Sequence, residues 1–332
     1  GFGISYTPYL SKLVNDISLG NITYFNRLNE RSAFAASFKY FSLGEIELIQ
    51  DEFSEALVTK PNELTMDVSY SLRLADQFSM GVSLRYLRSD LKISQVDDTA
   101  IAASSYAVDL SGYYQGEEQA YNEFNGRWRA GFIIQNLGPK IKYDESAVSA
   151  SFLPTMLRLG GGFDFILDPY NKVSVTAEFS KLLVPTPPLL GTFTDYNDAN
   201  GNGVFDEEED QIGLPYTGII SGKPNDVDFL AGVFQSFSDA PGGFSEELRE
   251  FTWSLGAEYT YEDSFALRAG FFNESEDKGA RKFLALGAGF KFTGTNIDLS
   301  YLFSASKVPS PLENTLRFSL TFNFGDNEYY EY

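Results

Sequence analysis

The chain of 332 residues contains no cysteine and no histidine. The absence of cysteine excludes disulfides, thiolate metal sites and thiol catalysis. The absence of histidine excludes Ser-His-Asp and Cys-His catalysis and most zinc chemistry. If the protein were an enzyme, only Ser-Lys or carboxylate chemistry would remain to it.

Long hydrophobic runs are also missing. No apolar segment approaches the roughly 18 residues that a membrane-spanning helix requires. Charged residues make up 21% of the chain and its mean hydropathy is -0.19, as in an ordinary soluble protein. A transmembrane β-barrel has a similar mean hydropathy, because its membrane-facing residues alternate with polar ones.

Positive charge is scarce. The 25 Lys and Arg residues are outnumbered by 46 Asp and Glu residues, which gives a net charge of -21. A surface of this sign repels phosphates and argues against nucleic acid as a partner. Aromatic residues are abundant instead, at 16%, and many Tyr and Trp residues lie near the ends of apolar segments. Such positions suit the two interfaces of a membrane.

Apolar and polar residues alternate along much of the chain. In the segment 171–183, every second residue from Val173 to Phe179 is apolar and the residues between them are polar. A β-strand places these two sets on opposite faces. We predict fourteen such strands, at 1–7, 17–27, 32–42, 64–74, 78–93, 106–114, 127–135, 157–167, 171–183, 251–261, 265–272, 283–292, 297–304 and 316–324.

The lengths of the connections alternate as well. Connections after even-numbered strands are short, at 28–31, 75–77, 168–171, 262–264 and 293–296, with 115–126 as the exception. Connections after odd-numbered strands are mostly longer, at 44–63, 94–105, 136–156, 183–250, 273–282 and 305–315. Short turns at one end and long loops at the other are typical of outer-membrane barrels. A soluble β-sandwich has no reason to sort its loops by end.

The polar faces of the strands carry charges of both signs. They include Asp67, Arg73, Arg85, Asp109, Arg129, Arg158, Asp164, Glu178, Glu258, Arg268, Lys291, Asp298 and Arg317. A soluble barrel would turn this face outward, whereas a membrane barrel turns it to the lumen, where opposite charges neutralise one another. We therefore predict an all-β fold: a transmembrane antiparallel β-barrel of about 14 strands over residues 1–325. It would lie in the bacterial outer membrane, in contact with membrane lipid, and end in an acidic tail at 326–332.

The connection at 184–250 is far longer than an ordinary loop. Residues 198–209 within it match the twelve-residue EF-hand calcium loop at each ligand position, with Gly203 at the sharp turn. The predicted ligands of Ca²⁺ are Asp198, Asn200, Asn202, the carbonyl of Val204, Asp206 and Glu209. No amphipathic helices flank the motif, so it predicts a structural calcium clip. The alternative is a solvated acidic loop.

Two further parts of this connection have recognisable patterns. Residues 185–190 predict a stiff, extended segment. Residues 226–237 predict a short helix, with Asn225 or Asp226 as its cap. Its apolar face is formed by Phe229, Leu230, Val233, Phe234 and Phe237. This face either packs on neighbouring loops and the mouth of the barrel or is a docking surface for another protein.

Two segments resemble a known family. Residues 132–143 read FIIQNLGPKIKY and residues 152–162 read FLPTMLRLGGG. The turn Asn136-Leu137-Gly138 after a strand, followed by Leu153-Pro154 and Arg158-Leu159-Gly160, is similar to the PorV family of Bacteroidetes. That family belongs to the wider group of fourteen-stranded barrels like the fatty-acid transporter FadL. Neither segment carries chemistry, so the resemblance assigns a family and no catalytic site.

The resemblance implies a non-enzymatic role in the type IX secretion system. The expected partners are the C-terminal signal domains of cargo proteins and the giant SprA translocon barrel. Cargo would then be carried to the PorU sortase complex, which removes the signal and attaches the cargo to the cell surface. These partners are implied by the resemblance alone.

Two other functions compete with this one. A FadL-like channel for hydrophobic small molecules needs an apolar pocket and a lateral opening. The three glycines at 160–162 predict either a kink in the wall or close packing against a neighbouring strand. The charged lumen face disfavours passage of lipid. An outer-membrane hydrolase is the third candidate, but the paired carboxylates and arginines are better explained as structural neutralisation.

Overall fold

The structure is a computed structural model that describes residues 1–9, 16–49, 57–91, 100–144, 150–197, 211–306 and 312–324. It divides into two units. The barrel unit comprises Gly1–Leu182 and Phe251–Tyr332, and the loop unit comprises Leu183–Glu250. The calcium-type motif at 198–209 and the acidic tail at 326–332 lie outside the described residues.

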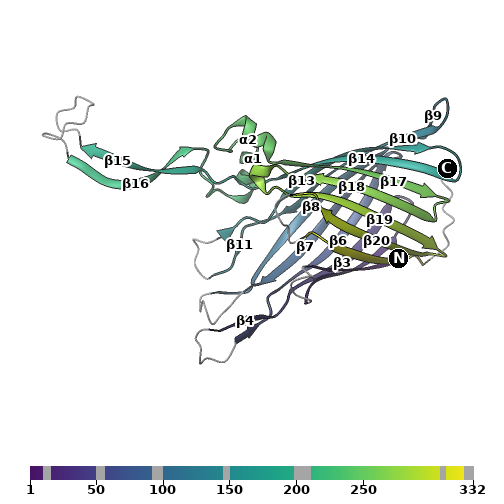
Figure 1. Ribbon diagram of the computed structural model, residues 1–332, viewed down its shortest axis with the longest axis horizontal. Coiled ribbons are helices and arrows are strands. Elements are labelled where there is room, and N and C mark those ends of the chain that lie inside the picture. The colour runs from purple at the N-terminus through teal and green to yellow at the C-terminus, as the bar shows by residue number, and fades with distance from the viewer. Residues whose placement is uncertain are drawn as a thin grey trace. The chain divides into compact units, whose positions relative to one another are not determined.

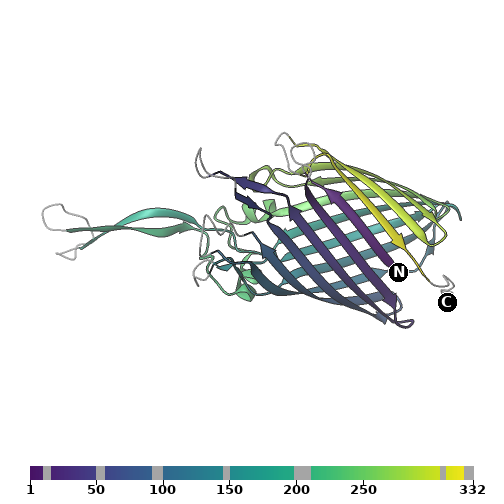
Figure 2. The ribbon, with the colours of Figure 1, turned by 90° about the horizontal axis from the view of Figure 1, so that it is seen from below.

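The barrel unit is a closed antiparallel sheet (Figures 1 and 2). Its fourteen strands are β1 (Phe2–Pro8), β2 (Ile17–Arg27), β3 (Ser32–Leu43), β6 (Asn62–Ala75), β7 (Phe78–Asp90), β8 (Ala103–Gln115), β10 (Asn125–Leu137), β13 (Met156–Ile166), β14 (Asn171–Leu182), β17 (Phe251–Tyr261), β18 (Phe265–Asn273), β19 (Lys282–Phe292), β20 (Thr295–Ser304) and β21 (Thr315–Phe322). Each strand pairs with the next, and β21 pairs with β1 to close the wall. The predicted fold class and strand number are confirmed, with ends shifted by three residues at most.

The connections are sorted by end, as predicted. The short turns and the N-terminus lie at one end of the barrel, the turn end, and the longer connections lie at the other, the loop end (Figure 1). At the loop end, β4 (Ile46–Leu48) pairs with β5 (Leu57–Thr59), and β11 (Ile141–Lys142) pairs with β12 (Ala150–Ser151). The connection between β18 and β19 contains the 3-10 helix Glu276–Lys278. At the turn end, β9 (Gln119–Ala120) extends the sheet beside β10.

The pairing register shows which face of each strand is turned to the lumen and which is turned outward. In β14, Ser174 lies opposite Glu258 of β17 and donates a hydrogen bond of 2.7 Å to Asp164 of β13, which puts this face in the lumen. Val175 therefore points to the outside, where 39% of it is exposed. Large apolar side chains are exposed on this outer face along the strands of the barrel unit. Because such a surface is unfavourable in water, it fits contact with lipid.

A small apolar core lies inside the loop end of the barrel. Ala103 and Ala107 of β8 share the lumen face with Leu87 of β7. Ile141 and Leu153, from the connection between β10 and β13, are buried against them. This connection therefore folds inward over the lumen side of β7 and β8, so it narrows the loop end.

The loop unit has secondary structure of its own. A hairpin of β15 (Leu189–Asn197) and β16 (Gln211–Ser221) precedes the two short helices α1 (Phe229–Gln235) and α2 (Phe244–Arg249). No helix in the described residues is long and apolar enough to cross a membrane. The hairpin and α2 were not predicted, and residues 189–190, expected in a stiff extended segment, begin β15.

The predicted helix at 226–237 is shorter than expected. It begins at Phe229, and its N-cap is Asp228, so the assignment of Asn225 or Asp226 as the cap was wrong. The backbone of Asp228 is extended, with ψ at 152°, and its side chain makes no capping hydrogen bond. The Gln235 side chain donates a hydrogen bond of 2.7 Å to the Pro224 carbonyl. In a continuing helix, a backbone amide would donate to that carbonyl. This contact ties the segment before α1 to the helix without making it helical.

Candidate functional site

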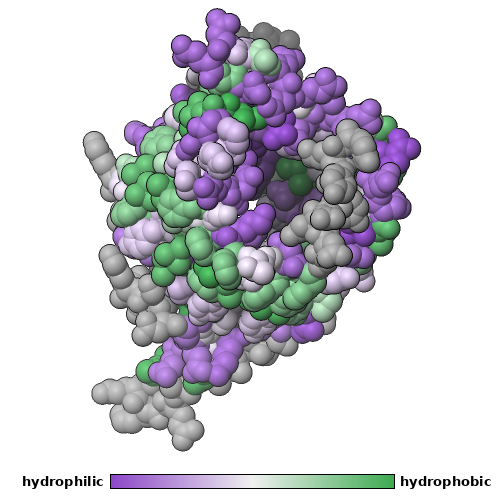
Figure 3. Space-filling model, turned by 90° about the vertical axis from the view of Figure 1, so that its right-hand side faces the viewer, coloured by the Kyte–Doolittle hydropathy of each residue, from purple (hydrophilic) through white to green (hydrophobic). Residues whose placement is uncertain are grey.

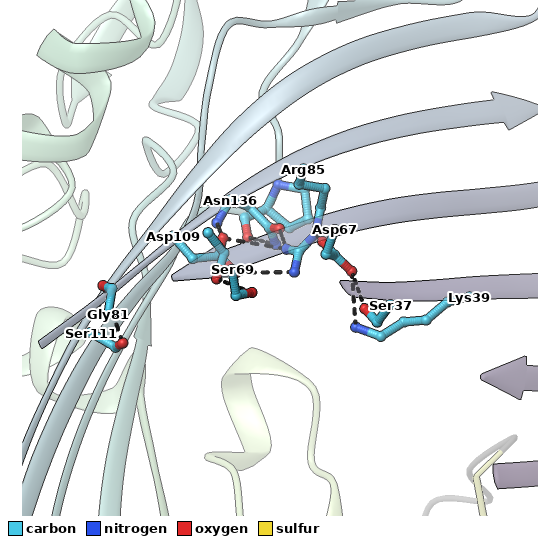
Figure 4. Close-up of polar contacts among 11 residues, drawn as sticks. Ser37, Lys39, Asp67, Ser69, Gly81, Arg85, Asp109, Ser111 and Asn136 are labelled. Atoms are coloured by element: carbon cyan, nitrogen blue, oxygen red, sulfur yellow. Dashed lines mark hydrogen bonds and ion pairs between the residues drawn. The ribbon is translucent and has the colours of Figure 1, made fainter. Parts of the chain in front are cut away.

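Arg85 of β7 is the centre of a buried ion-pair network on the lumen wall (Figure 4). Its guanidinium donates from Nε to Asp67 of β6 and from Nη2 to Asp109 of β8, the latter at 3.0 Å. Both carboxylates are only 5% exposed. Asp67 also accepts a hydrogen bond of 2.9 Å from the Ser37 hydroxyl, and Lys39 Nζ lies 3.8 Å from it. The network therefore neutralises buried charge and joins β3, β6, β7 and β8.

Asn136 connects this network to the inward-folded segment after β10 (Figure 4). Its φ of 59° is left-handed, a conformation that asparagine tolerates better than most residues. Its Oδ1 accepts from Arg85, and its Nδ2 donates to the Pro154 carbonyl at 3.0 Å. At Gly138 a Cβ would lie 2.2 Å from the Tyr106 carbonyl oxygen, so the chain passes too close for any other residue. The segment that carries the family resemblance thus fixes how the chain enters the lumen.

A second row of lumen-facing residues, most of them polar, crosses the opposite half of the wall. Cross-strand partners place one lumen-facing residue on each of eight adjacent strands, in the order Arg127, Asp164, Ser174, Glu258, Arg268, Gly287, Ser300 and Arg317. Arg268 donates to Asp298 at 2.6 Å and also to Glu258. Gly289 leaves the space for this pair, since a Cβ there would lie 2.6 Å from Asp298 Oδ1. A lumen cavity of about 500 Å³ lies beside this row.

The lumen face as a whole carries more bases than acids. The eleven bases on the described strands are Arg27, Lys39, Arg73, Arg85, Arg127, Arg129, Arg158, Lys172, Arg268, Lys291 and Arg317. The seven acids are Glu63, Asp67, Asp109, Asp164, Glu178, Glu258 and Asp298. All thirteen predicted lumen charges lie on this face. Arg27, Lys39, Glu63, Arg127 and Lys172 were missed.

The three glycines at 160–162 do not interrupt the wall. β13 keeps an unbroken register with β10 and with β14 through them. A Cβ at Gly162 would lie 2.8 Å from the Val175 carbonyl oxygen and 3.0 Å from Thr176 Oγ1. Close packing against β14 therefore explains this glycine, and a kink or gap does not.

Two acidic residues hold the inside of the loop unit together. Glu247 of α2 accepts hydrogen bonds from the backbone N–H groups of Asp239 and Ala240, at 2.7 and 2.9 Å. Asp239 is only 1% exposed and accepts the Thr186 N–H at 3.1 Å. Burial raises the pKa of Asp239; the hydrogen bond from Thr186 opposes this rise, and the nearby negative charges of Glu247 and Glu250 add to it.

The outside of the loop unit exposes large apolar side chains. Phe234 of α1 is 76% exposed and Phe244 of α2 is 77% exposed. Leu230, Phe237 and Leu248 are also exposed, and we call these five side chains the exposed apolar set. The predicted helix stripe is thus divided: Leu230, Phe234 and Phe237 are exposed, whereas Phe229 and Val233 are half-buried. Apolar side chains exposed to this extent are typical of interaction surfaces.

A sequence comparison decides the family. The family model described as "Type IX secretion system protein PorV" matches residues 1–189, which is more than half of the chain. The chain belongs to the PorV family. It is therefore an outer-membrane β-barrel component of the type IX secretion system. The match ends at the start of β15, so most of the loop unit lies beyond it. No curated protein matches the chain significantly.

Solved structures similar to this PorV-family chain are barrels with low sequence identity. The CymD monoaromatic hydrocarbon channel is 12% identical, covering 97% of this chain and 87% of its own, with a TM-score of 0.45. The toluene transporter TodX of Pseudomonas putida is 11% identical, covering 96% and 86%, with a TM-score of 0.44. LpxR from Salmonella typhimurium is 8% identical, covering 97% and 99%, with a TM-score of 0.37. None of these similarities assigns a ligand to the PorV-family barrel.

The predicted calcium site of this PorV-family chain stays a prediction. Its ligands, Asp198 to Glu209, lie outside the described residues. The strands on either side pair antiparallel, with Asn197 opposite Gln211, so the motif connects the two strands of a hairpin. Within the ranges that the structure describes, no group of three or more Asp, Glu, His or Cys residues is suited to a metal.

Proposed function

We propose that the chain is a non-enzymatic adaptor of the type IX secretion system that binds cargo proteins through its loop unit. The cargo would be recognised by its C-terminal signal domain and carried from the translocon barrel to the sortase complex at the cell surface. The observation that carries this proposal is the exposed apolar set of the loop unit, on α1, just after it, and on α2. A buried lumen network explains barrel stability, but only an exposed surface can hold a protein partner.

The chemistry of the loop unit favours a protein partner over a small molecule. Phe234 and Phe244, each more than three-quarters exposed, offer anchors of the kind that fill pockets in a partner. Residues 183–250 also carry 13 acidic and two basic residues. This negative charge on the loop unit would favour partners with basic surfaces and would accelerate their association.

The calcium-type motif belongs to the same proposal. Bound Ca²⁺ at Asp198, Asn200, Asn202, Val204, Asp206 and Glu209 would stiffen the connection between β15 and β16. The ion would supply positive charge where the loop unit is most acidic. Isothermal titration of the full chain with Ca²⁺, with Asp198→Ala as the control, tests this part. Absence of a calcium heat that depends on Asp198 would refute it.

The docking proposal is tested by pull-down from outer membranes. The double variant Phe234→Asp, Phe244→Asp should lose most recovery of cargo signal domains, because each change puts a charge into an apolar contact. Tyr170→Asp is the matched control, since Tyr170 is 60% exposed and lies in a short turn of the barrel unit. Equal recovery by the wild type and the double variant would contradict the proposal.

A further inference from the structure

The excess of bases on the lumen face is confined to one end of the barrel. Within the last three residues of each strand at the turn end, the lumen-facing positions include five bases, which we call the basic ring: Arg27, Arg73, Arg127, Lys172 and Lys291. They come from β2, β6, β10, β14 and β19, so they are spread around the whole wall. The remainder of the lumen face carries six bases and six acids and is balanced.

Acidic side chains cancel the ring in part. The one acid among the same lumen-facing positions is Asp164, whose side chain is 5% exposed; it pairs with Arg129 at 2.8 Å and also lies 3.5 Å from Arg127 of the ring. Lys172 lies 3.7 Å from Asp263, but that carboxylate is 82% exposed in a turn and is well screened by water. Arg73 and Lys291 have no ion-pair partner among the residues that the structure describes.

The turn end of the barrel is hollowed. Figure 3 shows a hollow at this end, bordered mainly by hydrophilic residues. The cavity of about 500 Å³ lies further along the same lumen wall, lined by Arg129, Arg268 and Arg317 among others. A solute that enters the lumen from the turns therefore passes the basic ring before it reaches this cavity. A mouth lined by one sign of charge between low-dielectric walls concentrates ions of the opposite sign.

We propose that the basic ring selects small anionic solutes, such as phosphates and carboxylates, for entry into the lumen. The chain has a net charge of -21, so this selectivity opposes the sign of the whole molecule. Rings of Arg and Lys are a known means of anion selection in membrane pores. The proposal does not depend on the secretion partners, because it concerns the barrel unit alone.

The absence of cysteine makes a direct test available. Ser79→Cys places a single thiol on the lumen face directly opposite Arg73. In the full chain in lipid nanodiscs, its rate of modification is measured with two methanethiosulfonate reagents, one carrying a sulfonate and one a trimethylammonium group. We expect the anionic reagent to react at least about tenfold faster, relative to the rates on a free thiol in solution. The ratio should fall at high salt, because screening shortens the reach of the ring.

Two further variants locate the effect. Adding Arg73→Gln and Lys291→Gln to Ser79→Cys should reduce the preference severalfold. Adding Arg88→Gln, which removes one charge near the loop end on the outer face, should leave it unchanged. Inorganic phosphate and acetate, used as competitors, distinguish phosphate from carboxylate recognition. Equal rates for the two reagents, failure of both to react, or a preference unaffected by the ring substitutions would each overturn the proposal.

Discussion

At the scale of single residues, Arg85 shows how a charge is retained inside the barrel wall. Its guanidinium forms ion pairs with Asp67 and Asp109, which are both almost fully buried. Charge buried in this way is stable only as a set, because removing one partner leaves the others unpaired away from water.

Arg85→Ala should therefore lower the free energy of unfolding of the barrel by about 3–5 kcal/mol, because it leaves two buried carboxylates without their cation. Equilibrium unfolding by guanidinium in lipid vesicles measures this. Arg88→Ala is the control, since Arg88 and Asp90 form an exposed pair at 3.3 Å whose loss should cost less than about 1 kcal/mol. Adding Asp109→Asn to Arg85→Ala should recover part of the loss. Equal effects of the two arginine substitutions would contradict this account.

Asp239 gives the loop unit a dependence on pH. Its folded pKa is raised above the ordinary value, mainly by burial, so the folded state holds the proton more tightly than the unfolded state. The stability contributed by this group is therefore present below the ordinary pKa and is lost as pH rises through the folded pKa. Asp239→Asn should remove this dependence, because the amide stays neutral.

The measurement is hydrogen exchange of the α2 amides, corrected for intrinsic rates, across the acidic range up to neutral pH. The wild type should lose protection as pH rises, and Asp239→Asn should lose less. Asp226→Asn is the control, since Asp226 is an exposed aspartate of the same unit. Parallel profiles for the wild type and Asp239→Asn would show that another group sets the pH dependence.

At the scale of elements, the faces of β14 decide how the barrel meets the membrane. Val175→Arg should impair folding into lipid by about 2–4 kcal/mol if the residue lies near the midplane, because the charge would face hydrocarbon. Thr176→Arg is the matched control. Thr176 pairs with Gly162 on the lumen face and lines the lumen cavity, so the new charge would lie in polar surroundings. Folding yields in lipid vesicles measure both. A larger loss for Thr176→Arg would mean that the faces are reversed.

The strands were predictable because the alternation of apolar and polar residues is visible within each strand alone, and β14 shows it in four successive residue pairs. The Arg85 network was not predictable in this way, although Arg85, Asp67 and Asp109 were each predicted to lie on the lumen face. Its partners lie 18, 24 and 51 residues away in the chain, and only the register brings them together. The hairpin of β15 and β16 was missed because Leu189 and Leu190 are adjacent apolar residues, and its pairing contains register shifts. The strand-end bases of the basic ring were partly missed because alternation is weakest where strands begin and end.

At the scale of the whole molecule, the loop unit is an insertion between two strands that already pair. Lys181 of β14 lies opposite Phe251 of β17, so the barrel wall is complete on either side of the insertion. Replacing residues 183–250 with a short Gly-Ser turn should therefore leave a barrel that folds in lipid, since a turn of about 2–5 residues can join antiparallel neighbours.

The deletion variant should keep the heat-dependent shift in electrophoretic mobility that reports a folded barrel and should lose recovery of cargo in the pull-down. A folded barrel that still recovers cargo would contradict the docking role of the loop unit. Failure of the barrel to fold would show that the loop unit is needed for closure.

The closure of the wall also affects the order in which parts of the molecule fold. Phe2 of β1 pairs with Phe322 of β21, so this seam joins two strands that are far apart in the sequence. Contacts of such sequence separation form slowly, because the whole chain between them must first be brought together. The loop unit is compact by itself and is formed by the continuous segment Leu183–Glu250. During assembly, the surface that would meet a partner can thus be folded before the barrel that carries it is sealed.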